Sequence, residues 1–414
     1  MVNYARASSL MNIKYKIIAS VLFFQINFLF AENNFEKNTS LTVEEVSIYS
    51  EKVLIDALDF VKNGNVDEAI EKLEKLIELN PSFNAAQLIY ADLMLSRSQP
   101  ITDFGNITNA PYTRINSLLS EVKARWNFHK ATIDNNKIPS SLIKLANSQS
   151  HVIVVDALTS RLFLFENNNG VPKLKSDFYV TIGKNGTGKY VEGDQKTPIG
   201  VYFVTGFIPS EDLPDLYGDG AFPINYPNAW DRSHNRTGYG IWLHGTPSKF
   251  YSRAPKDSDG CVIVSNNDLN TLSRFIDVGE TPIVIVDNIN WITKDEWEKR
   301  NTSYNLFVEQ WRQDWESRNV GSYLSHYSKD YTGLGKNYDS WVEYKSRIIP
   351  TKKFIKVDLS NKSVFVYPEP INLMVVTFMQ DYSSDTFRKK FLKRQYWKME
   401  QDGKWRIIFE GAAS

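Results

Sequence analysis

The sequence predicts a multidomain α+β protein with a helical N-terminal module, a β-sandwich in the middle and an α+β domain at the C-terminus. The chain has 414 residues, more than one typical domain of about 100–200 residues holds. Apolar residues recur every three or four positions in 42–97, and the period changes to two from His151. After Asn290, helical spacing returns and long alternating strands follow.

The composition is that of a soluble globular protein, with 42% hydrophobic and 23% charged residues. Lysine and arginine together number 48, and aspartate and glutamate also number 48. A balanced charge provides no basic excess for nucleic acid or an anionic membrane surface. We therefore expect no nucleic-acid partner.

Residues 1–31 have the features of a secretory signal peptide. Lys14 and Lys16 precede a short apolar run that ends at a small residue. An uncleaved membrane anchor is the alternative, but the run is short for a spanning helix of about 20 residues and contains Gln25 and Asn27. We expect export to the periplasm of a Gram-negative envelope, with no membrane span after signal cleavage.

Residues 42–130 are expected to form a helical N-terminal module. Gly64-Asn65 breaks the first helix pair, Asn80-Pro81 ends the second helix, and a linker at 98–110 precedes another helix near 115–128. A tetratricopeptide repeat has a similar spacing of small and apolar residues, here Phe60, Gly64, Ala69, Leu73 and Pro81. A plain helical hairpin is the alternative. Such a module offers a surface for a protein partner.

Residues 149–288 are expected to form the β-sandwich. The runs 151–155 and 161–165 are separated by Thr159-Ser160 and predict a hairpin. Ser265 and the polar residues after it predict the cap of a short helix over 269–275. Further β-rich runs occupy 178–182, 200–207, 240–243 and 282–286.

Residues 292–414 are expected to begin with helices and end in a curved antiparallel sheet. A helix over 295–319 carries aromatic residues, a shorter helical stretch contains Tyr323, Tyr327 and Tyr331, and a third helix lies near 338–347. The predicted strands are 354–358, 362–367, 372–381, 386–400 and 405–409. This order of elements resembles the nuclear-transport-factor-2-like cone. Its aromatic residues can form either a core or a ligand pocket.

The chain contains a single cysteine, Cys261, seventeen positions after His244. A free thiol with a pKa of about 8.5 is mostly protonated at neutral pH, so it needs a base to become a nucleophile. An imidazole can accept that proton and return it, which makes Cys261 and His244 the candidate catalytic pair. A buried structural cysteine is the alternative, but the neighbours Asp257 and Asp259 do not suit a core.

Two sequence blocks resemble the L,D-transpeptidase (YkuD-type) catalytic domain family. One is His244-Gly245 followed by Ser258–Val262, which reads SDGCV, and the other is Gly193–Tyr202, which reads GDQKTPIGVY. The resemblance covers 149–288 and implies a cysteine enzyme whose partner is the peptidoglycan stem peptide. It implies attack by Cys261 on the bond between meso-diaminopimelate and D-alanine of a tetrapeptide, through a thioester that an amine or water resolves.

The resemblance also suggests roles for the residues around the thiol. The backbone N–H groups of Gly260 and Cys261 would bind the oxyanion. Ser258 would orient the loop or contact the substrate, and the carbonyl of Gly245 would hold the imidazole tautomer. Asp259 stands where the family more often has histidine, and it is a candidate partner for the side-chain ammonium of diaminopimelate.

Three residues near the pair are candidates for binding a stem-peptide carboxylate, with solvated surface as the alternative for each: Arg236, Tyr239 and Arg253. His234 is an alternative base, although a surface-loop histidine is the simpler interpretation. The run Gly183–Lys189 matches G-x-x-x-x-G-K, but Tyr190 replaces the Ser/Thr of a phosphate-binding loop. The five histidines lack zinc-site spacing, so we propose no metal and no cofactor.

Two other functions are compatible with the sequence. YkuD-type domains joined to such a cone resemble L,D-carboxypeptidases that trim tetrapeptides to tripeptides and control cell shape. A non-catalytic peptidoglycan-binding scaffold is an alternative of another class, and the presence of both Cys261 and His244 argues against it.

Overall fold

The protein is described from a computed structural model that covers residues 43–101, 103–105, 111–131, 134–369 and 371–413. The predicted signal peptide, 1–31, lies outside the described residues, and so does part of the predicted linker at 98–110. Residues 47–414 form one compact unit. No helix in the described ranges is both long enough and apolar enough to cross a membrane.

The N-terminal module consists of helices that share one apolar core. Gly64 ends the first helix with a φ of +83°, a conformation that favours glycine. Leu54, Leu73 and Ile89 are fully buried in the core, which also includes Tyr251 from the domain that follows. The helices are α2 (Val43–Lys62), α3 (Val66–Leu79), α4 (Asn84–Ser96) and α5 (Tyr112–Lys130).

The middle of the chain folds into two sheets with a core between them. The first sheet has the order β5-β4-β3-β13-β7. Its strands β3 and β4 form the predicted hairpin, and β13 joins β3 in parallel. The strands are β3 (His151–Asp156), β4 (Arg161–Asn168), β5 (Val171–Tyr179), β7 (Gly200–Phe203) and β13 (Pro282–Val286).

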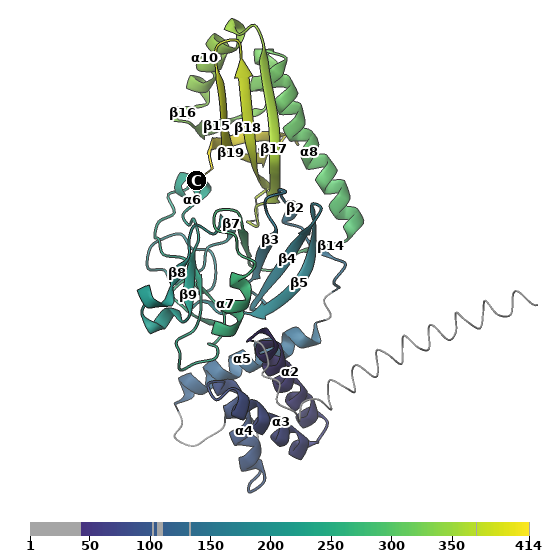
Figure 1. The fold of residues 1–414 in the computed structure, drawn as a ribbon, viewed down its shortest axis with the longest axis vertical. Helices are drawn as coiled ribbons and strands as arrows, with labels where there is room; N and C mark the ends of the chain where they lie inside the picture. The colour runs from purple at the N-terminus through teal and green to yellow at the C-terminus, as the bar shows by residue number, and fades with distance from the viewer. Residues whose placement is uncertain (1–42, 102, 106–110, 132–133, 370, 414) are drawn as a thin grey trace, which may run out of the picture. The chain divides into compact units, whose positions relative to one another are not determined.

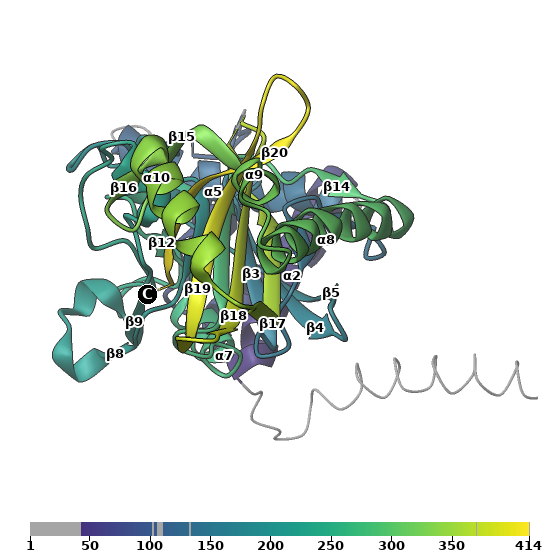
Figure 2. The same cartoon turned by 90° about the horizontal axis from the view of Figure 1, so that it is seen from above.

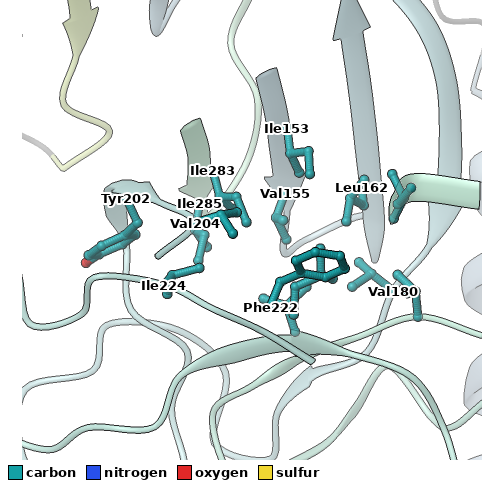
Figure 3. Packing of buried hydrophobic residues seen from close by; sticks show 14 of the residues in the cluster. Ile153, Val155, Leu162, Val180, Tyr202, Val204, Phe222, Ile224, Ile283 and Ile285 are labelled. Atoms are coloured by element: carbon teal, nitrogen blue, oxygen red, sulfur yellow. The ribbon is translucent and has the colours of Figure 1, made fainter. Parts of the chain in front are cut away.

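The second sheet has the order β12-β10-β9-β8 and faces the first across the apolar cluster drawn in Figure 3. Ile153 and Ile285 come from the first sheet and Phe222 from the second, which confirms the predicted β-sandwich. Its strands are β8 (Ile208–Pro209), β9 (Gly220–Pro223), β10 (Trp242–His244) and β12 (Val262–Ile263).

Shorter elements complete this domain. The Ser265 side chain accepts a hydrogen bond from the Asp268 N–H at the start of α7 (Asn266–Ser273), as the predicted cap requires. The parallel pair β6 (Ile182–Gly183) and β11 (Lys256–Ser258) borders the segment that leads to Cys261. Helix α6 (Ala229–Ser233) was not predicted, because five residues carry too little periodicity.

The C-terminal domain is the predicted α+β cone. Helices α8 (Lys294–Glu316), α9 (Val320–Leu324) and α10 (Tyr338–Ile348) pack on one face of a seven-stranded sheet (Figures 1 and 2). Trp311, Phe378 and Trp397 are completely buried between these layers. The sheet has the order β16-β15-β20-β19-β18-β17-β2. Its C-terminal strands are β15 (Tyr327–Gly333), β16 (Lys336–Asn337), β17 (Ile355–Val366), β18 (Leu373–Ser384), β19 (Arg388–Met399) and β20 (Trp405–Ala412).

Two predictions for this domain are wrong in detail. Tyr327 and Tyr331 lie in strand β15 and not in a helix. A spacing of four fits one face of a helix and also alternate positions of a strand, and pairing with β20 selects the strand. The two runs predicted at 354–358 and 362–367 form the single strand β17, whose register shifts at Asn361, where φ is +50°.

The segment before the sandwich ties the domains together. Strand β1 (Ile138–Pro139) pairs with β14 (Trp291–Ile292), and β2 (Leu142–Lys144) adds to the edge of the cone at β17. A second core joins the outer face of the five-stranded sheet to the cone, with Phe165 and Val284 on one side and Phe365 and Leu373 on the other. These long-range pairings were not predicted.

Candidate active site

His244 is the last residue of β10, and Cys261 directly precedes β12, the parallel neighbour of β10 in the second sheet. Leu243 and Val262 are register partners, and both side chains are buried in the core of the sandwich. Side chains alternate along a strand, so His244 and Cys261 project from the opposite face. Ile241 and Val264 are also core residues, which fits the same alternation.

The imidazole of His244 is held in one tautomer. Its Nδ1 lies 2.7 Å from the carbonyl oxygen of Gly245, and a carbonyl can only accept, so Nδ1 carries the proton. Within the described residues Nε2 has no hydrogen-bond partner. Burial lowers the pKa of His244 to about 4, and the Arg253 charge also lowers it, against the effect of the Gly245 carbonyl. The side chain is therefore a neutral base at neutral pH.

The thiol of Cys261 is partly exposed and protonated at rest. Its Sγ donates to the carbonyl oxygen of Gly240 at 3.4 Å. The pKa of Cys261 is raised to about 11, mainly by burial; the Trp242 backbone N–H opposes the rise and Asp259 contributes to it. Lys189 and Arg253 lower it to a smaller extent. A thiol with this pKa would need a base to accept its proton before it could act as a nucleophile.

Ser258 fixes the loop that precedes the thiol. Its Oγ donates to the carbonyl oxygen of Cys261 at 2.6 Å and accepts the N–H of Gly260 at 3.1 Å. The Gly260 N–H, which was expected to bind the oxyanion, donates to Ser258 in this structure. Among the described residues, no acceptor is found for the Cys261 N–H.

The backbone conformation at position 260 requires glycine. Its φ is +126°, and a Cβ there would lie 2.7 Å from the carbonyl oxygen of Lys196. Thr197, the next residue, is fully buried and contacts the same loop. Its Oγ1 donates to the carbonyl oxygen of Gly260 and accepts the N–H of Gly183, both at 2.9 Å. Sequence reasoning assigned Thr197 no role, although its place in the Gly193–Tyr202 block was a signal.

Comparison with known proteins agrees with both predicted domains. Residues 150–285 match the YkuD family, described as the L,D-transpeptidase catalytic domain, and residues 303–411 match the Cds6 C-terminal NTF2-like domain. Bd1075 of Bdellovibrio bacteriovorus is 33% identical over 67% of this chain and 98% of that chain, with a TM-score of 0.60. The chain therefore belongs to the family of proteins that join a YkuD domain to an NTF2-like C-terminal domain.

A further solved structure shares the fold. The helical cell shape determining protein Pgp2 of Campylobacter jejuni is 20% identical over 71% of this chain and 99% of that chain, with a TM-score of 0.56. A variant of Pgp2 gives a TM-score of 0.57 at 21% identity, over 70% of this chain and 99% of that chain. No curated protein matches the sequence.

Two of the predicted substrate-binding residues lie beside the catalytic pair of the YkuD domain. Arg253 donates from Nε to Asp257 Oδ2 at 2.9 Å, and its charge affects the pKa values of both His244 and Cys261. Asp259 accepts hydrogen bonds from Lys184 and Gln195, each at 3.0 Å. Asp259 is exposed, so a substrate ammonium would compete with these two neighbours.

The other two predicted substrate-binding residues, Tyr239 and Arg236, lie on the segment that leads into β10. Tyr239 is 77% exposed and precedes Gly240, the acceptor of the thiol. Arg236 is nearly buried; it donates to Asp231 at 3.0 Å and forms an ion pair with Glu369 of the NTF2-like domain. Two carboxylates already balance the guanidinium, so this geometry favours a link between the domains over substrate binding by Arg236.

The alternative base and the phosphate-loop-like run both have structural roles in the YkuD domain. His234 caps α6, with Nδ1 3.0 Å from the carbonyl oxygen of Trp230 and its ring 3.8 Å from that indole. No helix begins in residues 183–199, all of which are described, so the Gly183–Lys189 run is not a phosphate-binding loop. Lys189 instead donates to Asp194 at 2.9 Å.

Proposed function

We propose that the chain is a cysteine acyltransferase or hydrolase that acts on peptidoglycan tetrapeptide stems at the bond between meso-diaminopimelate and D-alanine. The observation that carries the proposal is a neutral imidazole, oriented by Gly245 at the end of β10, and a protonated thiol directly before the neighbouring parallel strand β12. Membership in the YkuD family supports the substrate class.

In the acylation step, His244 Nε2 takes the Sγ proton as Cys261 attacks the carbonyl carbon of the diaminopimelate L-centre. The N–H of Cys261 binds the oxyanion of the tetrahedral intermediate. The C–N bond then breaks, and the imidazolium returns the proton to the leaving amine of D-alanine. The products are D-alanine and a thioester on Cys261.

In the second step an acceptor resolves the thioester. His244 takes a proton from the acceptor, which attacks the thioester carbonyl, and the sulfur leaves and is reprotonated. A diaminopimelate amine as acceptor yields a cross-link, and water yields a tripeptide. Membership in the YkuD family supports the type of enzyme, and the identity of the acceptor is a more specific proposal.

We propose water as the acceptor, which makes the chain an L,D-carboxypeptidase that trims tetrapeptides in the control of cell shape. The supporting observation is the joint match to a YkuD domain and a Cds6-type domain, an arrangement shared with the cell shape determining protein Pgp2. A scaffold that only binds the wall does not need an oriented imidazole beside a thiol.

The proposed substrate lies outside the cytoplasmic membrane, so the proposal includes export to the periplasm. The signal-like sequence of residues 1–31 supports it. The wall stem peptide is then the partner that the function requires, and a protein partner of the helical module stays a prediction.

The test is incubation of the protein with disaccharide-tetrapeptides and analysis of the products. D-alanine with tripeptide alone supports hydrolysis, and dimers would reassign the acceptor to an amine. Cys261→Ala and His244→Gln should abolish turnover. His326→Gln is the matched control, because His326 lies in the NTF2-like domain on Asp314. Full turnover by Cys261→Ala would refute the nucleophile.

A further inference from the structure

The loop between His244 and Cys261 packs against the N-terminal helical module. The Tyr251 side chain is only 6% exposed and belongs to the apolar core of that module. Its ring lies 4.6 Å from the ring of Phe83, and its backbone N–H donates to the carbonyl oxygen of Ser82 at 3.0 Å. The module therefore holds both the side chain and the backbone of the loop at this position.

A buried polar contact holds the next residue. Ser252 Oγ donates to Glu121 Oε1 of α5 at 2.5 Å, and Glu121 is 1% exposed. Burial raises the pKa of Glu121, while Arg125 and the Ser252 hydrogen bond lower it. Hydrogen bonds to a carboxylate are stronger than those between neutral groups, so this contact restrains the loop.

The module is itself anchored to the first sheet of the YkuD domain. Glu51 of α2 accepts from Arg125 at 2.9 Å and forms an ion pair with Arg161 of β4. The Arg125 guanidinium also lies 3.9 Å from the ring centre of Tyr179, whose hydroxyl donates to the carbonyl oxygen of Arg253 at 2.9 Å. The backbone of Arg253 is thus fixed directly after the two residues that the module holds.

We propose that the helical module positions the loop between His244 and Cys261, and that Glu121 and Ser252 are positioning residues for Arg253. The consequence for turnover rests on the proposed function, whereas the effect on the reactivity of the thiol does not. A loop without the contacts to the module would sample more backbone conformations, and the Arg253 charge would be held less firmly beside the thiol.

Because Arg253 is charged, its position has a measurable effect on the pKa of the thiol. The charged groups that act on the thiol are Asp259, which opposes its ionisation, and Lys189 and Arg253, which favour it. His244 lies on the neighbouring strand; burial is the main cause of its lowered pKa, and Arg253 adds to that effect. If the loop relaxes, Arg253 moves away, the pKa of Cys261 rises, and less thiolate is present at a given pH.

The experiment uses the single cysteine, because alkylation by iodoacetamide then reports Cys261 alone. Glu121→Ala should slow alkylation about threefold at a fixed pH below the thiol pKa, as half a pKa unit does. It should also lower kcat on disaccharide-tetrapeptide more than it changes KM. Arg125 keeps Glu51 as its partner in this variant. Glu121→Gln should restore both values, because its amide oxygen still accepts from Ser252.

A second variant and a control complete the test. Ser252→Ala should reproduce the effect of Glu121→Ala, and the double variant should show no further loss. Asp67→Asn is the control, because Asp67 pairs with Arg97 at an exposed site on the same module. The proposal is overturned if Glu121→Ala and Ser252→Ala keep the wild-type alkylation profile. This holds also if the two variants melt at a lower temperature than the wild type. If the wild type releases no D-alanine but the alkylation effect persists, the proposed function fails and the positioning stands.

Discussion

Thr197 connects the two sequence blocks at the scale of single residues. Replacing it with valine keeps its shape but removes the hydrogen bond to Gly260 and leaves the Gly183 N–H without a partner. We expect a loss of stability of about 1–3 kcal/mol, as for other buried unsatisfied groups. We also expect kcat to fall roughly 10- to 100-fold, because the thiol is displaced.

Urea unfolding and steady-state kinetics on a soluble muropeptide measure these two effects. Thr197→Ser is the control, since its hydroxyl can restore both hydrogen bonds. A valine variant with unchanged kcat would show that the Gly260 carbonyl needs no fixed orientation.

The two proposed catalytic groups predict an unusual dependence on pH. The pKa of His244 is lowered to about 4 and that of Cys261 is raised to about 11, so the neutral pair prevails between these values. We expect kcat/KM to rise through the acid limit and to stay level across neutral pH. The two limits belong to the pair as a whole. A profile that rises steeply through pH 7 would contradict a neutral resting pair.

The residues of the site differ in how far the sequence predicts them. Cys261 and His244 were predicted because a lone thiol and an imidazole in known spacing indicate one chemistry. The hydrogen bond that occupies the Gly260 N–H was not predicted, because only the folded structure shows that this N–H donates to the Ser258 hydroxyl. Arg236 likewise reads as an exposed arginine until Glu369 is brought beside it from the other domain.

At the scale of elements, the segment that carries Arg236 is held by the cone. Glu369→Gln removes one of its two carboxylate partners, and Asp231 remains. We expect a loss of about 1–2 kcal/mol in the free energy of unfolding, less than for a buried charge left without any partner. Urea unfolding measures the loss.

The matched control is the half-exposed ion pair of Asp56 with Lys72, 3.8 Å apart. Asp56→Asn should cost less than about 0.5 kcal/mol, as exposed pairs usually do. Equal losses in the two variants would show that Glu369 contributes no more than a surface charge.

Element type was predictable where the apolar period was long and unambiguous. The helix at 295–319 and the hairpin after His151 are of this kind, and the structure has both as α8 and β3–β4. Tyr327 and Tyr331 were placed in a helix because a spacing of four does not distinguish the two element types. The partner strand β20 decides the outcome, and no local pattern contains it.

At the scale of the whole molecule, the catalytic domain depends on the cone for part of its core. A chain shortened by removal of residues 300–414 would expose the outer face of the first sheet, where Phe165 and Val284 contact Phe365 and Leu373. We expect this truncated protein to aggregate or to melt well below the full chain, because a large apolar face becomes exposed.

Thermal melting and size-exclusion chromatography test this dependence, with Asp67→Asn in the full chain as a folded reference. A truncated protein that stays monomeric and melts like the full chain would show that the two domains are independent. The three parts of the chain were predictable from changes in apolar period. Their shared core was not, because it depends on which distant faces meet.

The strand β2 constrains the order in which the molecule can assemble. Its partner β17 follows about 220 positions later in the chain, where Val364 faces Lys144. On a ribosome the early segment is synthesised long before its partner, so its backbone groups stay solvated until nearly all of the polypeptide has emerged. The pairing of β2 with β17 is therefore one of the last steps of folding, and it follows the synthesis of most of the chain.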